Sequence, residues 1–168
     1  YILFFTNKGK VYRKKTWEIP EAGRNAKGTP IVNLLELEKG EEISAVIPVK
    51  NFSDNEYLVM VTKNGVIKKT PAELYSNIRK GGLIALNLRD NDELISVFVT
   101  KGNNDILIAT RNGMGIRFNE KDVRPMGRGA TGVKAITLGG DDYVIGADVI
   151  TDGCKVLLVS EKGFGKCT

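Results

Sequence analysis

The sequence lacks histidine and has only two cysteines, Cys154 and Cys167, among its 168 residues. Without histidine or a CxxC pair, a zinc site of the usual type is not expected. Acid–base or triad catalysis would have to use carboxylates, lysines or a thiol. We interpret the cysteines as two half-buried thiols and not as a disulfide. We therefore predict no metal site.

Two further absences concern membranes and enzymes. No apolar run approaches the roughly 18–20 residues needed to cross a bilayer, and the short run at residues 1–5 is followed at once by a turn, unlike a secretory signal. No P-loop, GxSxG or HExxH motif is present. The glycine-rich stretch 127–132 lacks the GK[ST] that a phosphate loop requires. We predict no membrane partner, no catalytic residue and no cofactor.

The composition is that of a globular protein with a mild positive charge. Apolar residues make up 42% and charged residues 27% of the chain. The 25 lysines and arginines exceed the 20 acidic residues, giving a net charge of +5. This excess is compatible with nucleic acid or another acidic partner, but it does not by itself identify one.

An opening phrase occurs four times along the chain. It has five residues rich in large apolar side chains, then Thr or Ser, then a short loop that ends in Gly. The copies are Tyr1–Gly9, Tyr57–Gly65, Asp105–Gly113 and Lys155–Gly163, with their glycines 56, 48 and 50 residues apart. Because a second strand-like segment follows each glycine, the phrase predicts a β-hairpin.

Two more segments repeat in register with the hairpin. A basic, Gly-containing loop leads into an apolar strand at Arg24–Leu34, Arg79–Leu86 and Arg128–Ile136. An acidic turn leads into another strand at Gly40–Ile47, Asp92–Val97 and Asp141–Ala147. Four strands in a unit of about 50 residues are typical of a propeller blade. Continuous apolar runs such as 58–61 indicate strands covered on both faces, and residues 71–75 and 119–123 predict single helical turns.

The predicted fold is therefore all-β, a propeller-like repeat in one domain, residues 1–168. Its units span about 1–56, 57–104 and 105–154, with an incomplete unit at 155–168. Propellers close with roughly four to eight blades, and an open arc exposes strand edges. We expect the parent protein to continue on both sides. A secondary expectation is that the isolated fragment self-associates through its open blade edges.

The charges follow the repeat. Acids gather at the acidic turns, where we interpret them as solvated turn residues, and bases gather on the second hairpin strand and the following loop. The candidate DNA-binding residues are Arg13, Lys14, Lys15, Arg24, Lys27, Lys68, Lys69, Arg79, Lys80, Arg117, Arg124, Arg128 and Lys134. Repetition of the blade would align them as a positive band suited to duplex phosphates. The alternative is that they keep exposed hairpins soluble.

The band predicts DNA binding without base reading, because no recognition helix is visible. We expect salt-sensitive binding with weak sequence preference. The other hypothesis is a protein-interaction propeller resembling RCC1-like or WD-repeat scaffolds. The WD and GH signatures are missing, which weighs against this second hypothesis.

Two segments carry a specific family resemblance. Tyr12–Leu37, which includes Ile19-Pro-Glu-Ala22, and Val123–Val133, with its Val-Arg-x-Met-Gly-Arg-x-x-x-Gly-Val phrase, resemble the C-terminal domain of the A subunit of bacterial DNA gyrase. The resemblance covers essentially the whole chain. The A subunit of topoisomerase IV has a related but more degenerate domain.

The resemblance implies a β-pinwheel of six blades that exchange strands, of which this chain holds about three and a third. It implies double-stranded DNA wrapped around a basic outer rim, supporting negative supercoiling in the bacterial cytoplasm, at the nucleoid. ATP hydrolysis would belong to the B subunit and the cleaving tyrosine to the N-terminal part of the A subunit, both partners in an A2B2 complex. The family's Gln-Arg-Arg-Gly-Gly-rich box, normally upstream of the first strand, is absent here, which leaves gyrase and topoisomerase IV both open.

Overall fold

The computed structural model describes residues 1–52 and 55–168 and shows an all-β chain, as predicted. Its strands are β1 Ile2–Thr6, β2 Lys10–Lys14, β3 Ile43–Pro48, β4 Tyr57–Thr62, β5 Val66–Pro71, β6 Leu83–Ile84, β7 Leu94–Thr100, β8 Asp105–Thr110, β9 Gly115–Asn119, β10 Val133–Lys134, β11 Val144–Ile150, β12 Leu157–Val159 and β13 Gly165–Cys167. Its helices are short 3-10 turns, η1 Thr16–Glu18, η2 Ile31–Asn33, η3 Ala72–Tyr75 and η4 Glu120–Asp122. The single turns expected at 71–75 and 119–123 are confirmed as η3 and η4.

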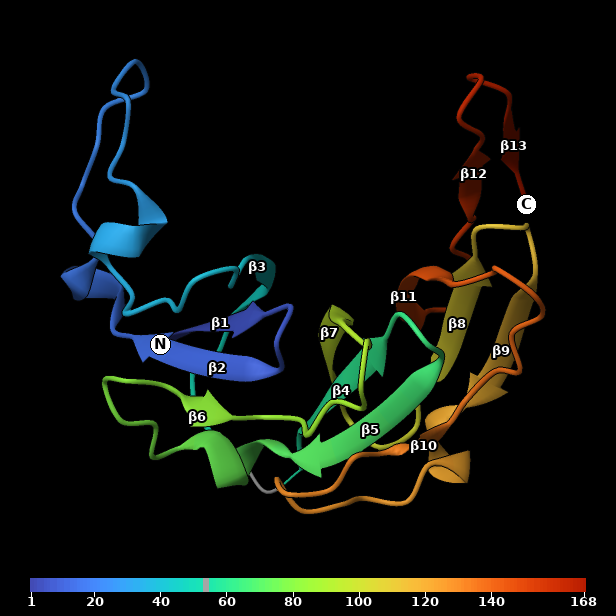
Figure 1. The fold of residues 1–168 in the computed structure, drawn as a ribbon, viewed down its shortest axis with the longest axis horizontal. Coiled ribbons are helices and arrows are strands. Elements are labelled where there is room, and N and C mark those ends of the chain that lie inside the picture. Colours follow the sequence, from blue (N-terminus) through green and yellow to red (C-terminus); the bar gives the residue numbers. More distant parts are fainter. Residues whose placement is uncertain (53–54) are drawn as a thin grey trace.

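The strands form sheets that follow one another along an arc (Figure 1). The sheet orders are β3-β1-β2-β6, β10-β5-β4-β7, β11-β8-β9 and β12-β13. The fourth strand of a complete sheet comes from the next unit, since β6 pairs with β2 and β10 pairs with β5. The blades therefore exchange strands. The strands β3, β7 and β11 lie side by side, so β6 and β10 occupy the opposite, outer edge of their sheets.

The repeated Thr/Ser and Gly build the hairpin turn. In the first copy the Gly9 N–H donates to the Thr6 carbonyl at 2.9 Å, and the Lys10 N–H donates to Thr6 Oγ1 at 3.3 Å. The same side-chain bond recurs at Thr62, Thr110 and Ser160, at 3.1, 3.2 and 3.1 Å. The hydroxyl therefore closes each turn, which explains why only Thr or Ser stands there.

The glycine of the turn also makes room for the exchanged segment. The Gly9 carbonyl accepts the Ala85 N–H at 2.8 Å, and the Gly65 carbonyl accepts the Ala135 N–H at 2.8 Å. A Cβ on Gly9 would lie 2.5 Å from the Leu86 carbonyl oxygen. At Gly113 nothing lies within 4 Å of such a Cβ, and residues 1–52 and 55–168 contribute no exchanged segment at this position.

Two cores lie between successive sheets. Leu58 and Met60 of β4 pack into the core shared with the first sheet, and Val59 and Val61 pack into the core shared with the third. All four side chains are fully buried. The prediction that this continuous apolar run is covered on both faces is confirmed.

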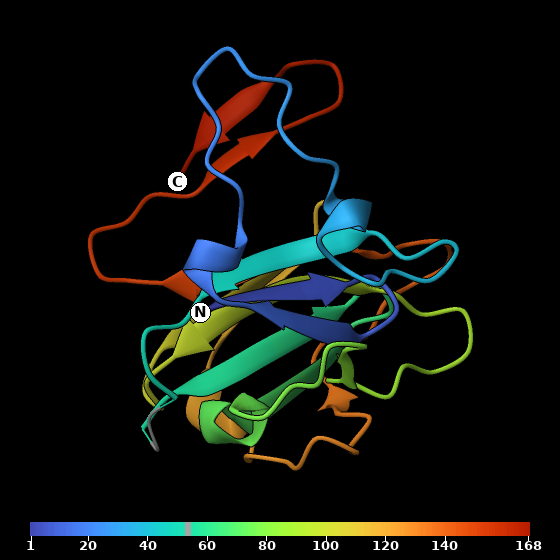
Figure 2. The same ribbon diagram turned by 90° about the vertical axis from the view of Figure 1, so that its left-hand side faces the viewer.

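Two segments differ from the sequence predictions. The expected apolar strand of the first basic loop is instead the 3-10 helix η2, because the described residues hold no earlier hairpin with which it could pair. Cys154 and Cys167 are both free and exposed, not half-buried. The loop between η1 and η2 and the β12–β13 hairpin stand clear of the stacked sheets (Figure 2). Among the described residues, no helix is long and apolar enough to cross a membrane.

Candidate nucleic-acid interface

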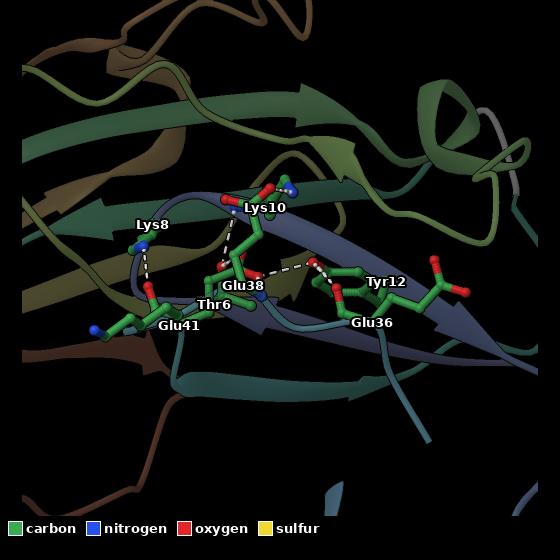
Figure 3. Close-up of polar contacts among 8 residues, drawn as sticks. Thr6, Lys8, Lys10, Tyr12, Glu36, Glu38 and Glu41 are labelled. Atoms are coloured by element: carbon green, nitrogen blue, oxygen red, sulfur yellow. Dashed lines mark hydrogen bonds and ion pairs between the residues drawn. The ribbon is translucent and has the colours of Figure 1, made fainter. Parts of the chain in front are cut away.

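One acid in each acidic turn is structural, which corrects the expectation of solvated residues for Glu41, Asp92 and Asp142. The other turn acids are exposed, as expected: Glu36, Glu38, Glu42, Asp90, Glu93 and Asp141. Glu41 is only 7% exposed and accepts hydrogen bonds from Thr6 Oγ1 at 3.1 Å, Tyr12 Oη at 2.8 Å and the Glu38 N–H at 2.7 Å (Figure 3). Burial alone would raise the pKa of Glu41, but the bonds from Glu38, Tyr12 and Thr6 outweigh it and hold the pKa below its ordinary value.

The same turn recurs in the next two units with aspartate. Asp92 Oδ1 accepts the Asn64 N–H at 2.9 Å, and Asp142 Oδ1 accepts the Asn112 N–H at 3.0 Å. Each carboxylate thus ties its acidic turn to the hairpin turn of its own unit. These three acids therefore stabilise the fold of the repeat.

In each of the first three units, one base near these turns is paired with an acid. At the acidic turns the ion pairs are Lys10–Glu38 at 2.6 Å, Lys63–Glu93 at 3.2 Å and Arg111–Asp141 at 3.9 Å, one in each of the first three units. Exposed pairs of this kind add little stability, but they cancel positive charge locally. Positive and negative charges that are far apart in the sequence are therefore neighbours in space at the turns.

At the outer edge, three of the candidate bases gather around one hollow of about 600 Å³. Arg13 comes from the end of β2, Arg79 from the loop before β6, and Arg128 from the loop before β10, so three successive units contribute one arginine each. Asn77, Ile78, Gly82 and Leu83 complete the lining, which includes no carboxylate. The hollow is therefore strongly cationic.

The remaining candidates lie on or next to the strands β2 and β10, or in loops. The half-buried Lys14 and the exposed Lys15 continue from β2, the exposed Arg124 precedes β10, and the exposed Lys134 is part of β10. Arg24 and Lys27 are exposed on the loop between η1 and η2. Lys80 is exposed and lies 3.7 Å from Glu36. Arg117 is engaged by Asp105 at 2.7 Å, which reduces what it can offer to a phosphate.

Lys68 and Lys69 do not lie in the band, and this corrects the candidate set. Lys68 is fully buried, and its Nζ donates to the Ala85 carbonyl at 2.7 Å and to the Arg128 carbonyl. Lys69 is 4% exposed, donates to the Glu120 carbonyl at 2.7 Å and lies 3.7 Å from the Glu120 carboxylate. Both lysines join the second unit to the third, so neither is available to a phosphate.

Alignment of the repeated hairpins gives the sequence signal by which these two lysines could have been identified as structural. Lys68 occupies the position that Tyr12 and Ile116 hold in the neighbouring hairpins, a position of large side chains facing inward. Lys69 is the counterpart of Arg13. Each lies over the ring of the tyrosine that begins its hairpin: Lys69 is 5.2 Å from the ring centre of Tyr57, and Arg13 is 4.9 Å from that of Tyr1. Each also donates to a backbone carbonyl of the next unit.

The buried Lys68 predicts an unusual pH dependence of stability. Burial, and then the nearby Arg128 guanidinium, lower the pKa of Lys68 from 10.5 to about 8. Between these values the unfolded chain holds a proton that the native protein has lost, so the free energy of unfolding rises with pH, by about 1–2 kcal/mol from pH 8 to pH 9.5. Lys68→Met should abolish this rise.

The measurement is urea unfolding at both pH values. The other titratable or charged groups facing Lys68 are Arg128 and Tyr75, which shares the Ala85 carbonyl at 3.1 Å. Burial raises the pKa of Tyr75 to about 12, so it lowers stability only above pH 10, outside the tested range. A rise of equal size in Lys68→Met would assign the effect to another group.

Sheets completed by a strand from the next unit, with a cationic outer edge, define a bladed β-repeat protein of the propeller-like pinwheel class. The chain belongs to the family of DNA gyrase C-terminal domains: the family model described as "DNA gyrase C-terminal domain, beta-propeller" matches residues 1–50, 56–101 and 104–151. The predicted family is thereby confirmed.

Individual relatives agree with this assignment. The chain is 62% identical over 133 residues, 79% of its length, to the A subunit of DNA gyrase from Clostridium acetobutylicum. It is 48% identical over its whole length to the corresponding gyrase protein of Staphylococcus epidermidis. It spans 16% and 19% of these proteins, less than a fifth of their length.

Solved structures share the fold. The C-terminal domain of DNA topoisomerase IV matches 99% of this chain and 52% of that one, with a TM-score of 0.91 and 32% identity. A DNA gyrase A C-terminal domain matches 99% of this chain and 53% of that one, with a TM-score of 0.82 and 28% identity. The two domains share one architecture with this chain, so the fold does not separate gyrase from topoisomerase IV.

Proposed function

We propose that this chain binds duplex DNA along its outer edge without reading bases, and that it wraps the duplex in support of negative supercoiling by gyrase. The observation that carries the proposal is the distribution of charge. One base in each of the first three units is paired with an acid at the turns, whereas Arg13, Arg79 and Arg128 line an outer hollow without a carboxylate. Membership of the gyrase family supports the same conclusion.

Arrangement along the arc favours wrapping over binding at a single spot. The exchanged strands β6 and β10 occupy equivalent outer edges of successive sheets, and each is preceded by a basic loop. A duplex that follows these loops meets a base at each blade and must bend with the arc. Phosphate contacts, which do not depend on base sequence, would offset the cost of bending the duplex.

Salt titration of duplex binding tests the proposal. With five phosphate contacts the logarithm of affinity should fall with a slope of about −4.5 against the logarithm of salt concentration, a loss of about 500-fold between roughly 50 and 200 mM. Duplexes of unrelated sequence should bind equally. Absence of binding at low salt would instead favour the alternative, a protein-interaction propeller of the RCC1-like kind.

Wrapping is tested separately from binding. Nicked circular DNA sealed by ligase while the protein is bound should show a changed linking number after the protein is removed. The expected change grows with the amount of protein. Salt-sensitive binding with no change in linking number would leave DNA binding intact and reject wrapping.

The remaining parts of the proposal concern the parent enzyme. ATP hydrolysis and DNA cleavage are assigned to the B subunit and to the N-terminal part of the A subunit, in an A2B2 complex in the bacterial cytoplasm, and this chain is assigned no catalytic residue, cofactor or metal. The equivalent domain of topoisomerase IV is a second candidate, favoured by the structural match, whereas the sequence relatives favour gyrase. An isolated fragment is expected to self-associate through the unpaired edge of β9.

A further inference from the structure

The hollow at the outer edge has the features of a site prepared for one anion. Its charged lining residues are Arg13, Arg79 and Arg128, and its remaining lining residues are neutral. None of these three arginines takes part in an ion pair of the described residues. Three arginines that line one hollow without an acid repel one another, and an anion bound among them would relieve that repulsion.

Two of the three arginines are tied to their surroundings by contacts of their own. Arg13 donates from Nη1 to the Ser76 carbonyl and lies over the Tyr1 ring at 4.9 Å. The Arg128 carbonyl accepts a bond from the buried Lys68. The next residue of that loop, Gly129, accepts the Asn87 amide at 2.8 Å. The Arg13 side chain and the Arg128 backbone are therefore held before any ligand arrives, which lowers the entropy cost of binding.

The turn that carries Arg79 is held against the first hairpin. Gly82 lies in the lining of the hollow with a φ of +81°, and the turn before it is closed by the Gly82 N–H, which donates to the Arg79 carbonyl at 3.0 Å. A Cβ on Gly82 would lie 2.8 Å from the Tyr12 ring, so the glycine lets this turn pack directly against the first hairpin. Beneath the Arg128 loop, the ammonium of Lys68 adds a fourth positive charge when protonated, and its lowered pKa reflects in part the Arg128 guanidinium beside it.

We propose that this hollow is a seat for a single backbone phosphate of the duplex, assembled across the seam of three successive units by Arg13, Arg79 and Arg128. The inference rests on the proposed DNA-binding function and deepens it. A guanidinium binds a phosphate through paired N–H donors, so three of them surround one phosphate more firmly than a lysine track could. The bound phosphate would fix the register of the duplex where the path crosses from one blade to the next.

The test replaces the three arginines together, Arg13→Gln, Arg79→Gln and Arg128→Gln. A matched control replaces Lys10, Lys63 and Arg111 by Gln, which removes the same charge, one base per unit, from side chains already paired with acids. We expect the arginine variant to bind duplex DNA at least tenfold more weakly at low salt. Its salt slope should be shallower by about 1, the value for one lost phosphate contact. The control should bind like the wild-type protein.

Other outcomes separate failure of the seat from failure of the function. A slope shallower by about 3 would show three independent phosphates and overturn the single seat. An arginine variant that behaves like the control overturns it as well. A wild-type protein that binds no duplex at low salt overturns the DNA-binding function itself. Arg79→Gln alone serves as a second variant that does not endanger folding, because Arg79 is exposed. It should lower affinity about threefold or more, and an unchanged affinity would contradict the seat.

Discussion

Replacing Glu120 by alanine should lower the free energy of unfolding by about 3–5 kcal/mol, because it leaves the buried Lys69 ammonium without its carboxylate. Glu120 is fully buried. Its carboxylate accepts Thr100 Oγ1 at 2.6 Å and the Asn104 N–H at 2.7 Å, besides lying 3.7 Å from Lys69 Nζ. All three groups lose a partner at once. Denaturant unfolding of the intact protein measures the loss.

A neighbouring acid supplies the control for this substitution. Asp122 lies in the same 3-10 helix, η4, but is exposed, so Asp122→Ala should change stability by no more than about 0.5 kcal/mol. Replacing Glu120 and Lys69 together by leucine and methionine should recover much of the loss, because no charge is then buried alone. If Glu120→Ala were as mild as Asp122→Ala, the buried pair would not join the second unit to the third as described.

Replacing Gly132 by alanine should detach β10 from β5 and cost at least about 2 kcal/mol. Gly132 has a φ of +95°, where an L-residue is strained by about 1–2 kcal/mol. An added Cβ would also lie 2.6 Å from the Ile67 carbonyl oxygen and 2.8 Å from Val66 Cγ1. Backbone cannot move aside there, since Ile67 and Val66 pair with Val133 and Lys134. The result is measured by unfolding and by hydrogen exchange of the β5 and β10 amides.

Gly129, three residues earlier, is the matched control. It has no positive φ, and nothing lies within 4 Å of a Cβ built on it. Gly129→Ala should leave both stability and amide protection within about 0.5 kcal/mol of the wild type. Equal effects at the two glycines would mean that the exchanged strand tolerates a side chain, against the geometry of this seam.

The repeat made much of the fold predictable from the sequence. Hairpins, single helical turns and double-sided burial of β4 all follow from local patterns, because turn chemistry and apolar periodicity act over a few residues. The exchange of strands is different. Leu83 and Ile84 are typical of a strand in any arrangement. The local sequence around them does not indicate which hairpin they pair with. That pairing is decided by the space around Gly9 and Tyr12, in another unit.

The sequence predicted that the candidate site consists of basic residues, but not which of the basic residues lie in it. Arg13, Arg79 and Arg128 are bases in a basic band, yet their convergence on one hollow depends on three units packing together. Lys68 and Lys69 have the same side chain and adjacent positions, and both are removed from the surface. The partner that buries Lys69 is Glu120, far along the chain, at a position where the preceding unit has Ala72. A deviation from the repeat, not the repeat itself, marks that buried pair.

The exchanged strands also impose an order on folding. Lys10 pairs with Ile84, and Val66 pairs with Lys134, so neither of these sheets can be completed while only its own unit has left the ribosome. At a synthesis rate of about 5–20 residues per second, the outer edge of each nascent blade stays open for seconds. During this interval β2 or β5 is a template for any passing strand, including that of a neighbouring nascent chain. The basic side chains on and beside those strands would first keep unfinished copies apart by charge repulsion, before they serve any ligand of the finished blade.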